Sequence, residues 1–439
     1  MAKTISVSNT SNVTLVGGAG SDTLSAHTAS NVNVYGNQGA DSISLNDGVT
    51  GATAYGGTGA DTIYASTVNT VWINGNKGAD SIDLFSATNA TVYGGTGSDT
   101  LIVGGPGTPI TINNALIYGN LGADSIELSA ANNVSVFGGT GNDTIAGSTV
   151  NNFVLSANQG SDAISFESVN NATVYGGTGN DSIYIESANN LIVNGNMGAD
   201  SIELYSASNA TVYGGRGTDS LYAEDISNAV ISGDNAADSI GLDDASNVSV
   251  SGGTGNDSIY AEFADNLLLN GNQGDDTISL YDVGATAYGG TGNDSIYADD
   301  VTAFIHGNKG NDTISATESD ATIHGGTGSD SIAVGTYDGA NLTGGSGNDT
   351  FALGFDKGAH DPSVEIADLT AHEDQLAFTH LTSTDGQNAS FATAGANLVI
   401  TFTTGAQLTL DGLGGQGFGG ASGTKFVGMA AAGYNVSFA

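Results

Sequence analysis

The stretch Gly94-Gly95-Thr96-Gly97-Ser98-Asp99-Thr100-Leu101 decides the fold of this chain, because variants of it occur eighteen times. Successive copies stand 18 to 25 residues apart, and most steps are 19 residues. An apolar residue, always Leu, Ile or Phe, follows each motif aspartate by two positions. A period this regular indicates one small supersecondary unit that stacks on copies of itself, with one inward-facing rung per coil.

The coil that starts at Asp80 shows the local pattern. Residues 81–85 alternate, so that Ile82 is expected to face inward and Asp83 outward, and residues 90–93 alternate again after a short polar corner. This pattern predicts two short strands and two turns per coil of about 19 residues. The fold expected for residues 1–350 is a right-handed parallel β-roll or β-solenoid of about 18 coils. Residues 351–439 lose the period and are expected to form a C-terminal β cap.

The charge balance excludes several classes of partner. The chain has 46 acidic and 6 basic residues, which gives a net charge of −40. Such a surface is unsuited to nucleic acid and to anionic membrane surfaces, and no apolar run approaches the roughly 18 residues of a membrane span. There is no cysteine, so neither disulfides nor zinc–thiolate sites can form. The N-terminal residues lack the apolar core of a secretory signal.

The repeated aspartates are the candidate metal ligands. Each copy of the motif brings one carboxylate and several glycine carbonyls to the same corner of successive coils. Carboxylates about 4.8 Å apart repel each other by about 0.9 kcal/mol per pair even in bulk water. Oxygen donors without thiolate or patterned histidine suit Ca²⁺. The alternative is a turn in which each aspartate caps backbone amides, but eighteen copies in register favour calcium. The predicted ligands are Asp22, Asp41, Asp61, Asp80, Asp99, Asp124, Asp143, Asp162, Asp181, Asp200, Asp219, Asp238, Asp257, Asp276, Asp294, Asp312, Asp330 and Asp349.

The motif resembles the glycine-rich nonapeptide G-G-x-G-x-D-x-U-x of repeats-in-toxin (RTX) proteins. The resemblance covers most of residues 17–355 and implies a parallel β-roll that binds several Ca²⁺ ions between stacked turns. It also implies a protein that a type I (ABC) transporter exports by reading its C-terminal region, and hence a secreted, extracellular or cell-surface location. RTX motifs usually recur every nine residues, whereas these recur about every 19, so calcium is expected along one edge only. The sequence leaves open whether Gly-Asn turns, such as Gly75-Asn76, bind calcium as Gly-Gly turns do.

No catalytic motif stands out, so no enzyme activity is expected. His372-Glu373 lacks the spacing of a zinc protease motif, and no nucleophile elbow is present. The function expected is a secreted calcium-binding structural protein of the bacterial cell surface or extracellular matrix. It would be an S-layer, filament or biofilm component that self-associates into a lattice or filament. Two alternatives are a glycan-binding adhesin that takes a surface polysaccharide on spaced tyrosines, and a polysaccharide-modifying enzyme that uses paired acidic residues.

Two further features of the sequence carry expectations. Outward tyrosines, including Tyr175, Tyr213 and Tyr288, precede the Gly-Gly turns that open every second coil. They are expected to recur about every 9.6 Å, twice the strand spacing, and to form a ribbed face on which copies of the protein pack. Residues 104–109 lengthen one coil by six residues and contain two of the three prolines. This insertion is expected to protrude as a loop.

Overall fold

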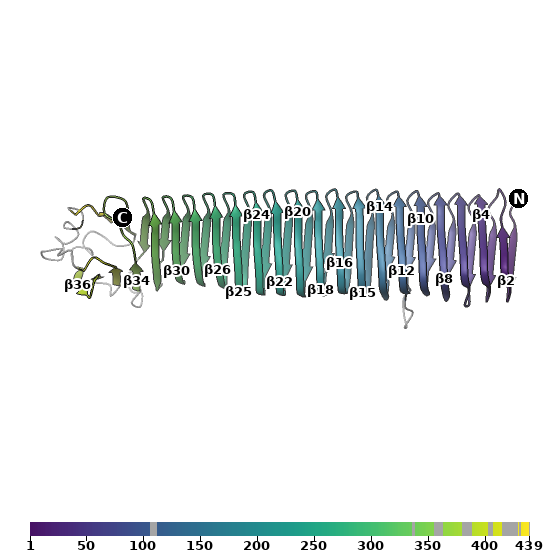
Figure 1. Ribbon diagram of the computed structural model, residues 1–439, viewed down its shortest axis with the longest axis horizontal. Helices are drawn as coiled ribbons and strands as arrows, with labels where there is room; N and C mark the ends of the chain where they lie inside the picture. The colour runs from purple at the N-terminus through teal and green to yellow at the C-terminus, as the bar shows by residue number, and fades with distance from the viewer. Residues whose placement is uncertain are drawn as a thin grey trace. The chain divides into compact units, whose positions relative to one another are not determined.

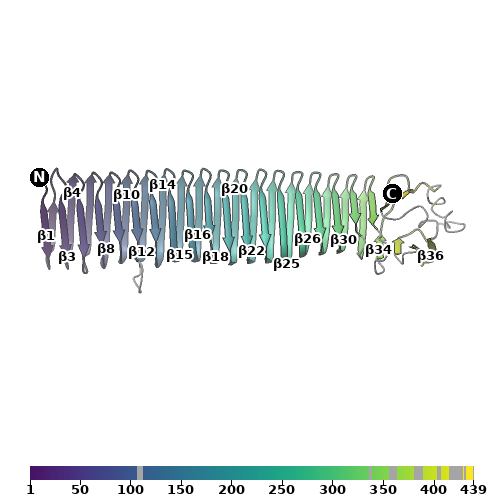
Figure 2. The same ribbon diagram turned by 180° about the vertical axis from the view of Figure 1, so that it is seen from behind.

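The computed structural model describes residues 1–105, 112–335, 339–354, 363–379, 389–402, 407–414, 429 and 432–438. The chain forms two compact units, Met1–Ala229 and Val230–Ala439. In both units the strands are short and pair mostly in parallel, as Figures 1 and 2 show from opposite sides. Residues 106–109 of the predicted loop lie outside the described residues. Within the described part of the chain, no helix has the length and apolar character of a membrane span.

Unit 1 contains two rows of strands, one on each side of the coil. The first row begins with β1 and continues with the strands that follow each motif aspartate, and within the unit these strands pair in parallel from coil to coil. Its members are β1 (Thr4–Ser8), β3 (Thr23–His27), β5 (Ser42–Asn46), β7 (Thr62–Ala65), β9 (Ser81–Leu84), β11 (Thr100–Val103), β13 (Ser125–Leu128), the start of β15 (Thr144–Gln159), the start of β16 (Ala163–Thr178), β17 (Ser182–Ile185), β19 (Ser201–Tyr205) and β21 (Ser220–Glu224).

The second row holds the strands that lead into each glycine turn. Its strands also pair in parallel from coil to coil. They are β2 (Ser11–Val16), β4 (Ser30–Gln38), β6 (Thr50–Thr58), β8 (Val68–Lys77), β10 (Ala87–Thr96), β12 (Ile112–Leu121), β14 (Ala131–Thr140), the later parts of β15 and β16, β18 (Ala188–Met197) and β20 (Ala207–Arg216). Strand β22 (Ser227–Asn235) crosses the boundary between the units.

Unit 2 repeats the same arrangement. Its first row holds β23 (Ser239–Asp243), the starts of β25 (Ser258–Gln273) and β26 (Thr277–Thr291), β27 (Ser295–Asp299), β29 (Thr313–Thr317), β31 (Ser331–Val334), β33 (Thr350–Gly354), β35 (Gln375–Thr379) and β39 (Asn435–Phe438). Its second row holds β24 (Ser246–Thr254), the later parts of β25 and β26, β28 (Thr302–Lys309), β30 (Asp320–Thr327), β32 (Ala340–Ser346), β34 (Ser363–Ile366) and β38 (Gln407–Leu410).

Parallel pairing continues beyond residue 350. Strand β33 pairs with β35, and β35 pairs with β39, all in parallel. Antiparallel pairing appears only with β36 (Ser390–Ala394), β37 (Asn397–Thr401) and β38 among the described strands. The expected domain boundary at residue 350 and the expected β cap stay predictions.

The core follows the alternation in the sequence. In the coil that starts at Asp80, Ile82 and Leu84 are 1% and 0% exposed, and Ala90 and Val92 are buried on the opposite strand. The apolar residue two positions after every motif aspartate is at most 3% exposed. Register keeps these residues in line, since Leu101 pairs with Ile82 on one side and with Ile126 on the other. The predicted parallel β-solenoid with about 19 residues per coil is confirmed.

Asparagine makes the second corner of the coil possible. Asn89 has a φ of 57° and Asn171 a φ of 52°, a left-handed conformation that asparagine tolerates better than most residues. Their side chains also form a ladder: the amide of Asn190 donates to the side-chain oxygen of Asn171 at 2.9 Å, and that of Asn171 donates to Asn152 at 3.2 Å. These bonds join coils at the corner where the apolar core ends.

Candidate metal centre

All eighteen predicted ligands lie at the glycine-rich corner, immediately before the first-row strands, and each is 1–3% exposed. The aspartates are stacked in register and form a column that we call the aspartate ladder. The backbone amide of Asp80 donates to Oδ1 of Asp99 at 2.8 Å, and the amide of Asp99 donates to Oδ1 of Asp124 at 2.8 Å. One carboxylate oxygen of each pair is therefore satisfied by a backbone amide of the preceding coil, which is the capping role weighed as the alternative to metal binding.

The second carboxylate oxygen, Oδ2, is in a different situation. It is buried and has no hydrogen-bond partner in Asp41, Asp61, Asp80, Asp99, Asp124, Asp143, Asp162, Asp181, Asp200, Asp257, Asp276, Asp294, Asp312, Asp330 and Asp349. Buried polar atoms in folded proteins are nearly always paired, because an unpaired one has lost its water at a cost of about 1–3 kcal/mol. A column of such oxygens calls for a partner other than a side chain or a backbone amide.

The first glycine of each turn leaves space beside these oxygens. A Cβ atom on Gly94 would lie 2.6 Å from Oδ2 of Asp99 and 2.8 Å from the carbonyl oxygen of Gly119, one coil further on. The slot at Gly252 in unit 2 is built alike, with Oδ2 of Asp257 and the carbonyl oxygen of Gly271. Glycine is therefore required here because a side chain would fill the space between a carboxylate and a carbonyl.

The donor set fits calcium. Carboxylate and backbone carbonyl oxygens are the ligands of this hard cation. Within the described residues, no three His, Asp or Glu side chains group together as metal ligands. A bound ion would therefore be held by aspartate Oδ2 atoms together with main-chain oxygens of the turns, and it would neutralise the buried carboxylates.

Gly-Asn turns present the same donors as Gly-Gly turns. Asn76 has a φ of 77° where Gly95 in the next coil has a φ of 123°, so both residues lie in the left-handed region. The slot at Gly75 contains Oδ2 of Asp80 and the carbonyl oxygen of Gly94. The departure at the second glycine thus leaves the candidate site intact. One turn does differ, because Ala157 replaces the first glycine and its buried methyl group lies in register with Gly176.

Burial shifts the titration of this column. Desolvation raises the pKa of Asp99, Asp143, Asp181 and Asp294 to about 7, and that of Asp61, Asp276, Asp330 and Asp349 to about 6. Neighbouring carboxylates raise these pKa values further, whereas the hydrogen bond from the preceding aspartate lowers them. Without a cation, these groups would carry an unfavourable charge at neutral pH.

The ladder has one member that sequence reasoning missed. Asp374 is 4% exposed, accepts the amide of Asp349 at 3.0 Å on Oδ1, and accepts the amide of Thr370 at 2.6 Å on Oδ2. It follows Asp349 by 25 residues, the same step as from Asp99 to Asp124. The glycines of the motif are absent before it, so only the apolar Leu376 two positions later signalled its place.

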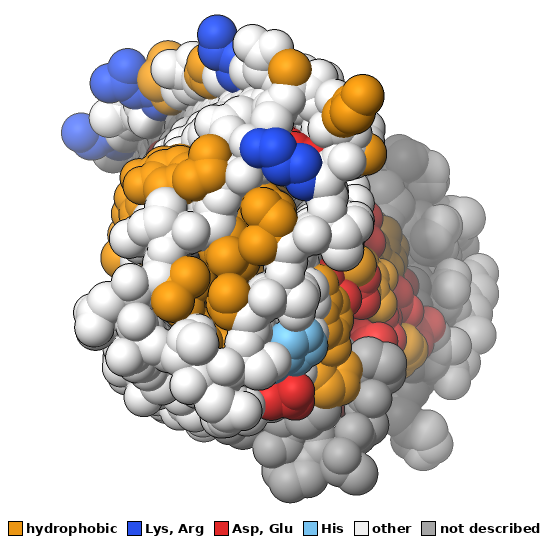
Figure 3. All heavy atoms as spheres, turned by 90° about the vertical axis from the view of Figure 1, so that its right-hand side faces the viewer, with side chains coloured by type: hydrophobic (Ala, Val, Ile, Leu, Met, Phe, Trp, Pro, Cys, Tyr) orange, Lys and Arg blue, Asp and Glu red, His pale blue; other side chains and the backbone are white. Residues whose placement is uncertain are grey.

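The first aspartate of the ladder, Asp22, is hydrogen-bonded to a cationic residue, Lys3. The backbone amide of Lys3 donates to Oδ1 of Asp22 at 2.5 Å, and the ammonium of Lys3 donates to the carbonyl oxygen of Gly17 at 2.8 Å; Figure 3 shows this end of unit 1. The pKa of Asp22 is lowered, first by the hydrogen bond from the Gly18 amide and further by Lys3. This aspartate, unlike those that follow it, is stabilised in its charged form.

Comparison with protein families agrees with this geometry. The model of the family described as RTX calcium-binding nonapeptide repeat (4 copies) matches more than half of the chain. The chain belongs to this family. The matched residues are 7–32, 51–67, 86–105, 118–154, 137–172, 168–202, 206–225, 243–268, 249–278, 285–300 and 304–332. Membership of the RTX family supports calcium binding by the repeats.

Two solved structures bear some likeness to this RTX protein. One is a hyperactive, Ca²⁺-dependent, β-helical antifreeze protein from an Antarctic bacterium, which is 20% identical with a TM-score of 0.37 over 70% of this chain and 83% of that chain. The other is the extracellular lipase LipA from Serratia marcescens, 18% identical with a TM-score of 0.15 over 48% of this chain and 43% of that one. Neither score is high enough to carry an argument about function. No curated protein matches the sequence.

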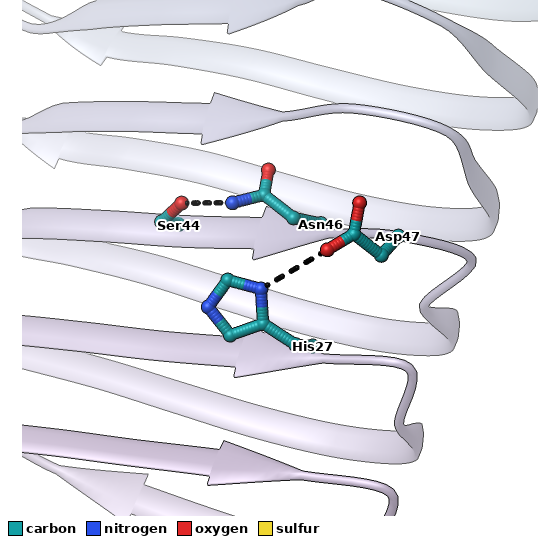
Figure 4. Close-up of polar contacts among 4 residues, drawn as sticks. All are labelled: His27, Ser44, Asn46 and Asp47. Carbon is teal, nitrogen blue, oxygen red and sulfur yellow. Dashed lines mark hydrogen bonds and ion pairs between the residues drawn. The ribbon is translucent and has the colours of Figure 1, made fainter.

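The histidines of this RTX protein do not form a catalytic arrangement in its described part. Nδ1 of His27 lies 3.4 Å from Oδ2 of Asp47, and both side chains are exposed (Figure 4). His306 and His324 stack with ring centroids 5.6 Å apart, in the outward column that holds Tyr288. Nδ1 of His306 accepts a hydrogen bond from the backbone amide of Asn308 at 2.9 Å, so this ring is bonded to the turn that follows it.

Proposed function

We propose that this RTX protein is a secreted structural protein of a bacterial cell surface or extracellular matrix. It folds when external calcium fills the aspartate ladder, and the folded chains assemble into an S-layer lattice, a filament or a biofilm matrix. The observation that carries the proposal is the column of buried Oδ2 oxygens without a hydrogen-bond partner, most of which share a glycine slot with a main-chain carbonyl of the next coil. No part of the described chain offers a competing catalytic arrangement, and the repeats occupy most of its length.

Calcium dependence follows from the site chemistry. The slots exist only when coils are stacked, so the free energy of metal binding is part of the free energy of folding. At the low calcium concentration of a bacterial cytoplasm, buried carboxylates disfavour the folded state, and millimolar external calcium reverses this. A chain that stays unfolded inside the cell would be competent for export through a type I transporter.

Calcium titration followed in parallel by circular dichroism and electron microscopy tests the proposal. The expected result is a largely unordered spectrum in chelator at pH 7, a cooperative gain of β structure with calcium, and ordered assemblies in the same samples. Magnesium at equal concentration serves as the control and is expected to be much less effective, because its octahedral shell fits a carbonyl-lined slot poorly. A native β spectrum in excess chelator at pH 7 would overturn the calcium-driven part.

Export is proposed to depend on residues 351–439. The test fuses this segment to a passenger protein in cells that carry a type I transporter, and also removes it from the full chain. The fusion should be exported and the truncated chain retained. Export of the truncated chain would contradict the proposal.

A further inference from the structure

The second row of unit 1 presents an outward face without any acidic residue. Its ten segments, which we call the neutral face, are β4, β6, β8, β10, β12, β14, the later parts of β15 and β16, β18 and β20. They contain no Asp or Glu, and their only charged side chains are Lys77 and Arg216, both at the end of a strand. For a chain with a net charge of −40, a face of this size without acid is unexpected.

The acidic residues of unit 1 lie elsewhere. Apart from the buried ladder, they are on the first row or at the corner that follows it. They are Asp47, Asp83, Glu127, Glu167, Glu186, Glu203, Glu224 and Asp225. The two rows of the same solenoid therefore differ in charge although they share coil, core and turn chemistry.

Aromatic rings run along the neutral face. They form an unbroken ladder of ring contacts from Tyr35 through Tyr55, Trp72, Tyr93 and Tyr118 to Phe137, with neighbouring ring centroids 4.7 to 5.5 Å apart; Trp72 is tilted to its neighbours and the other pairs are stacked. The sequence predicted aromatics on every second coil. Here the prediction is wrong, because Tyr118 belongs to a Gly-Asn coil and Trp72 leans across from the neighbouring column to fill the gap at Asn74. Farther along, Tyr175 and Tyr213 do alternate with Ser156 and Asn194.

A second column beside the rings is apolar on every second coil. Leu116, Val154 and Ile192 are 41%, 42% and 43% exposed, and they stand in register with Ser135 and Thr173 between them. Two shallow depressions lie where the ring ladder meets the turns. One is lined by Tyr35, Tyr55, Asn76 and Lys77, and the other by Tyr118, Phe137, Leu121 and Gln159. The face thus combines exposed apolar side chains with two shallow hollows.

Ring geometry separates the two classes of partner that could cover this face. The planes of Tyr35 and Tyr55 are 6° apart, those of Tyr93 and Tyr118 are 7° apart, and those of Tyr118 and Phe137 are 11° apart. In these three pairs the rings cover one another's faces, whereas Trp72 is tilted by 55° to Tyr55 and by 47° to Tyr93. A sugar stacks on an exposed ring face, so the stacked pairs suit a glycan poorly, whereas ring edges pack well against side chains of another protein.

Charge and size favour a second copy of this chain as that protein. Two molecules of net charge −40 repel each other least when their contact excludes the acidic rows, and only such a contact leaves acid on both outer sides. The neutral face extends about 43 Å across ten coils and about 30 Å along its strands of nine or ten residues. This is large enough for the area of about 800 Å² per partner in a standard interface.

We propose that the neutral face of unit 1 is a self-association surface whose partner is a second copy of this chain. The inference rests on the proposed assembly function and assigns its contact. The aromatic ladder and the column of Leu116, Val154 and Ile192 supply the buried centre, and Lys77 and Arg216 lie at the rim.

A pair of charge variants tests the assignment in full-length protein with saturating calcium. Leu116→Glu, Val154→Glu and Ile192→Glu together place three acids on the neutral face at exposed positions. The matched control, Ser6→Glu, Ser44→Glu and Ser165→Glu, adds the same charge to outward positions of the first row whose neighbours in register carry no acid. Sedimentation velocity over a dilution series measures association, and circular dichroism checks folding.

The wild type and the first-row variant are expected to associate alike. The neutral-face variant is expected to need at least a tenfold higher concentration, with unchanged calcium-induced folding. Equal association of both variants would overturn the assignment of the face while leaving the assembly function standing. A wild type that folds in calcium but stays monomeric would overturn the assembly function itself. If that monomer is held by immobilised neutral polysaccharide, and the neutral-face variant is not, the face binds glycan instead of a second copy.

Discussion

The ammonium of Lys3 donates a hydrogen bond to the carbonyl oxygen of Gly17 at 2.8 Å. In the coils that follow, the corresponding carbonyl faces Oδ2 of the preceding motif aspartate; Gly36, for example, faces Asp22 across the slot at Gly17. The first turn has no preceding motif aspartate, and Lys3 brings a positive charge to the equivalent place. The side chain therefore acts as a covalently attached cation at the start of the calcium ladder.

We predict that Lys3→Gln loosens the first coils only. Loss of the charge leaves the Gly17 carbonyl and Asp22 without their cation, so amide hydrogen exchange should speed up in β1, β2 and β3, while β19 and β21 keep their protection. Lys77→Gln is the matched control, since Lys77 lies in a later turn of the same unit with its side chain exposed to solvent. Equal exchange in wild type and Lys3→Gln would show that the lysine adds nothing.

Metal-free protein should depend on pH in the sense opposite to ordinary acid denaturation. Burial raises the pKa of Asp99 and Asp143 to about 7, above the value of about 4 in an unfolded chain. The folded state then binds more protons than the unfolded state between about pH 4 and 7, and stability falls as the pH rises through this window. The β signal in circular dichroism, recorded in chelator from pH 4 to pH 8, should therefore decline as the pH rises. A flat or rising profile would mean that the carboxylates are not desolvated without metal.

Asp99→Asn separates the cost of charge from the benefit of metal. Its amide oxygen can keep the hydrogen bond from Asp80, while the substitution removes the buried charge. In chelator the variant should keep its β structure to a higher pH than wild type does, and in calcium it should be less stable and bind less metal. Stability changes of the same sign in both conditions would contradict a calcium role for this carboxylate.

Much of the fold could be predicted because the residues within each coil determine its strands and turns. Alternation placed Ile82 and Leu84 in the core, and the period placed every motif aspartate at one corner. The ring ladder could not be foreseen, because it depends on how Trp72 leans toward its neighbours on adjacent coils. The role of Lys3 depends on a side chain outside the repeat, so no period signals it.

The different roles of the two oxygens in each motif carboxylate also could not be predicted from the sequence. An aspartate in a glycine turn is compatible with amide capping and with metal binding, and the residue pattern offers one or the other. In Asp99, Oδ1 takes the amide of Asp80, and Oδ2 stays buried beside the Gly119 carbonyl. Asp374 differs from Asp99, because both of its carboxylate oxygens accept backbone amides and no glycine slot precedes it.

Asn171 should tolerate glycine better than alanine. Its φ of 52° costs an alanine about 1–2 kcal/mol, and either substitution also removes the side-chain bonds to Asn152 and Asn190. Urea unfolding in saturating calcium should therefore rank wild type above Asn171→Gly, and Asn171→Gly above Asn171→Ala. Similar stability of the two variants would show that the side-chain hydrogen bonds between asparagines, and not the backbone conformation, explain why asparagine occupies this position.

The last prediction adds a methyl group to one glycine slot and removes a methyl group from another position of the same kind. Gly94 lies outside the left-handed φ region, so alanine can adopt its φ, but the added methyl would lie 2.6 Å from Oδ2 of Asp99 and 2.8 Å from the Gly119 carbonyl oxygen and would displace them. Ala157 carries such a methyl naturally, in register with Gly176. We expect Gly94→Ala to lose about one bound calcium and Ala157→Gly to gain about one, because a methyl and a cation compete for the same slot. Native mass spectrometry would count the ions, and Ala172→Gly, at a buried alanine of β16 away from the slots, controls for the flexibility of glycine. An unchanged count in both Gly94→Ala and Ala157→Gly would place the calcium ions elsewhere in the turn.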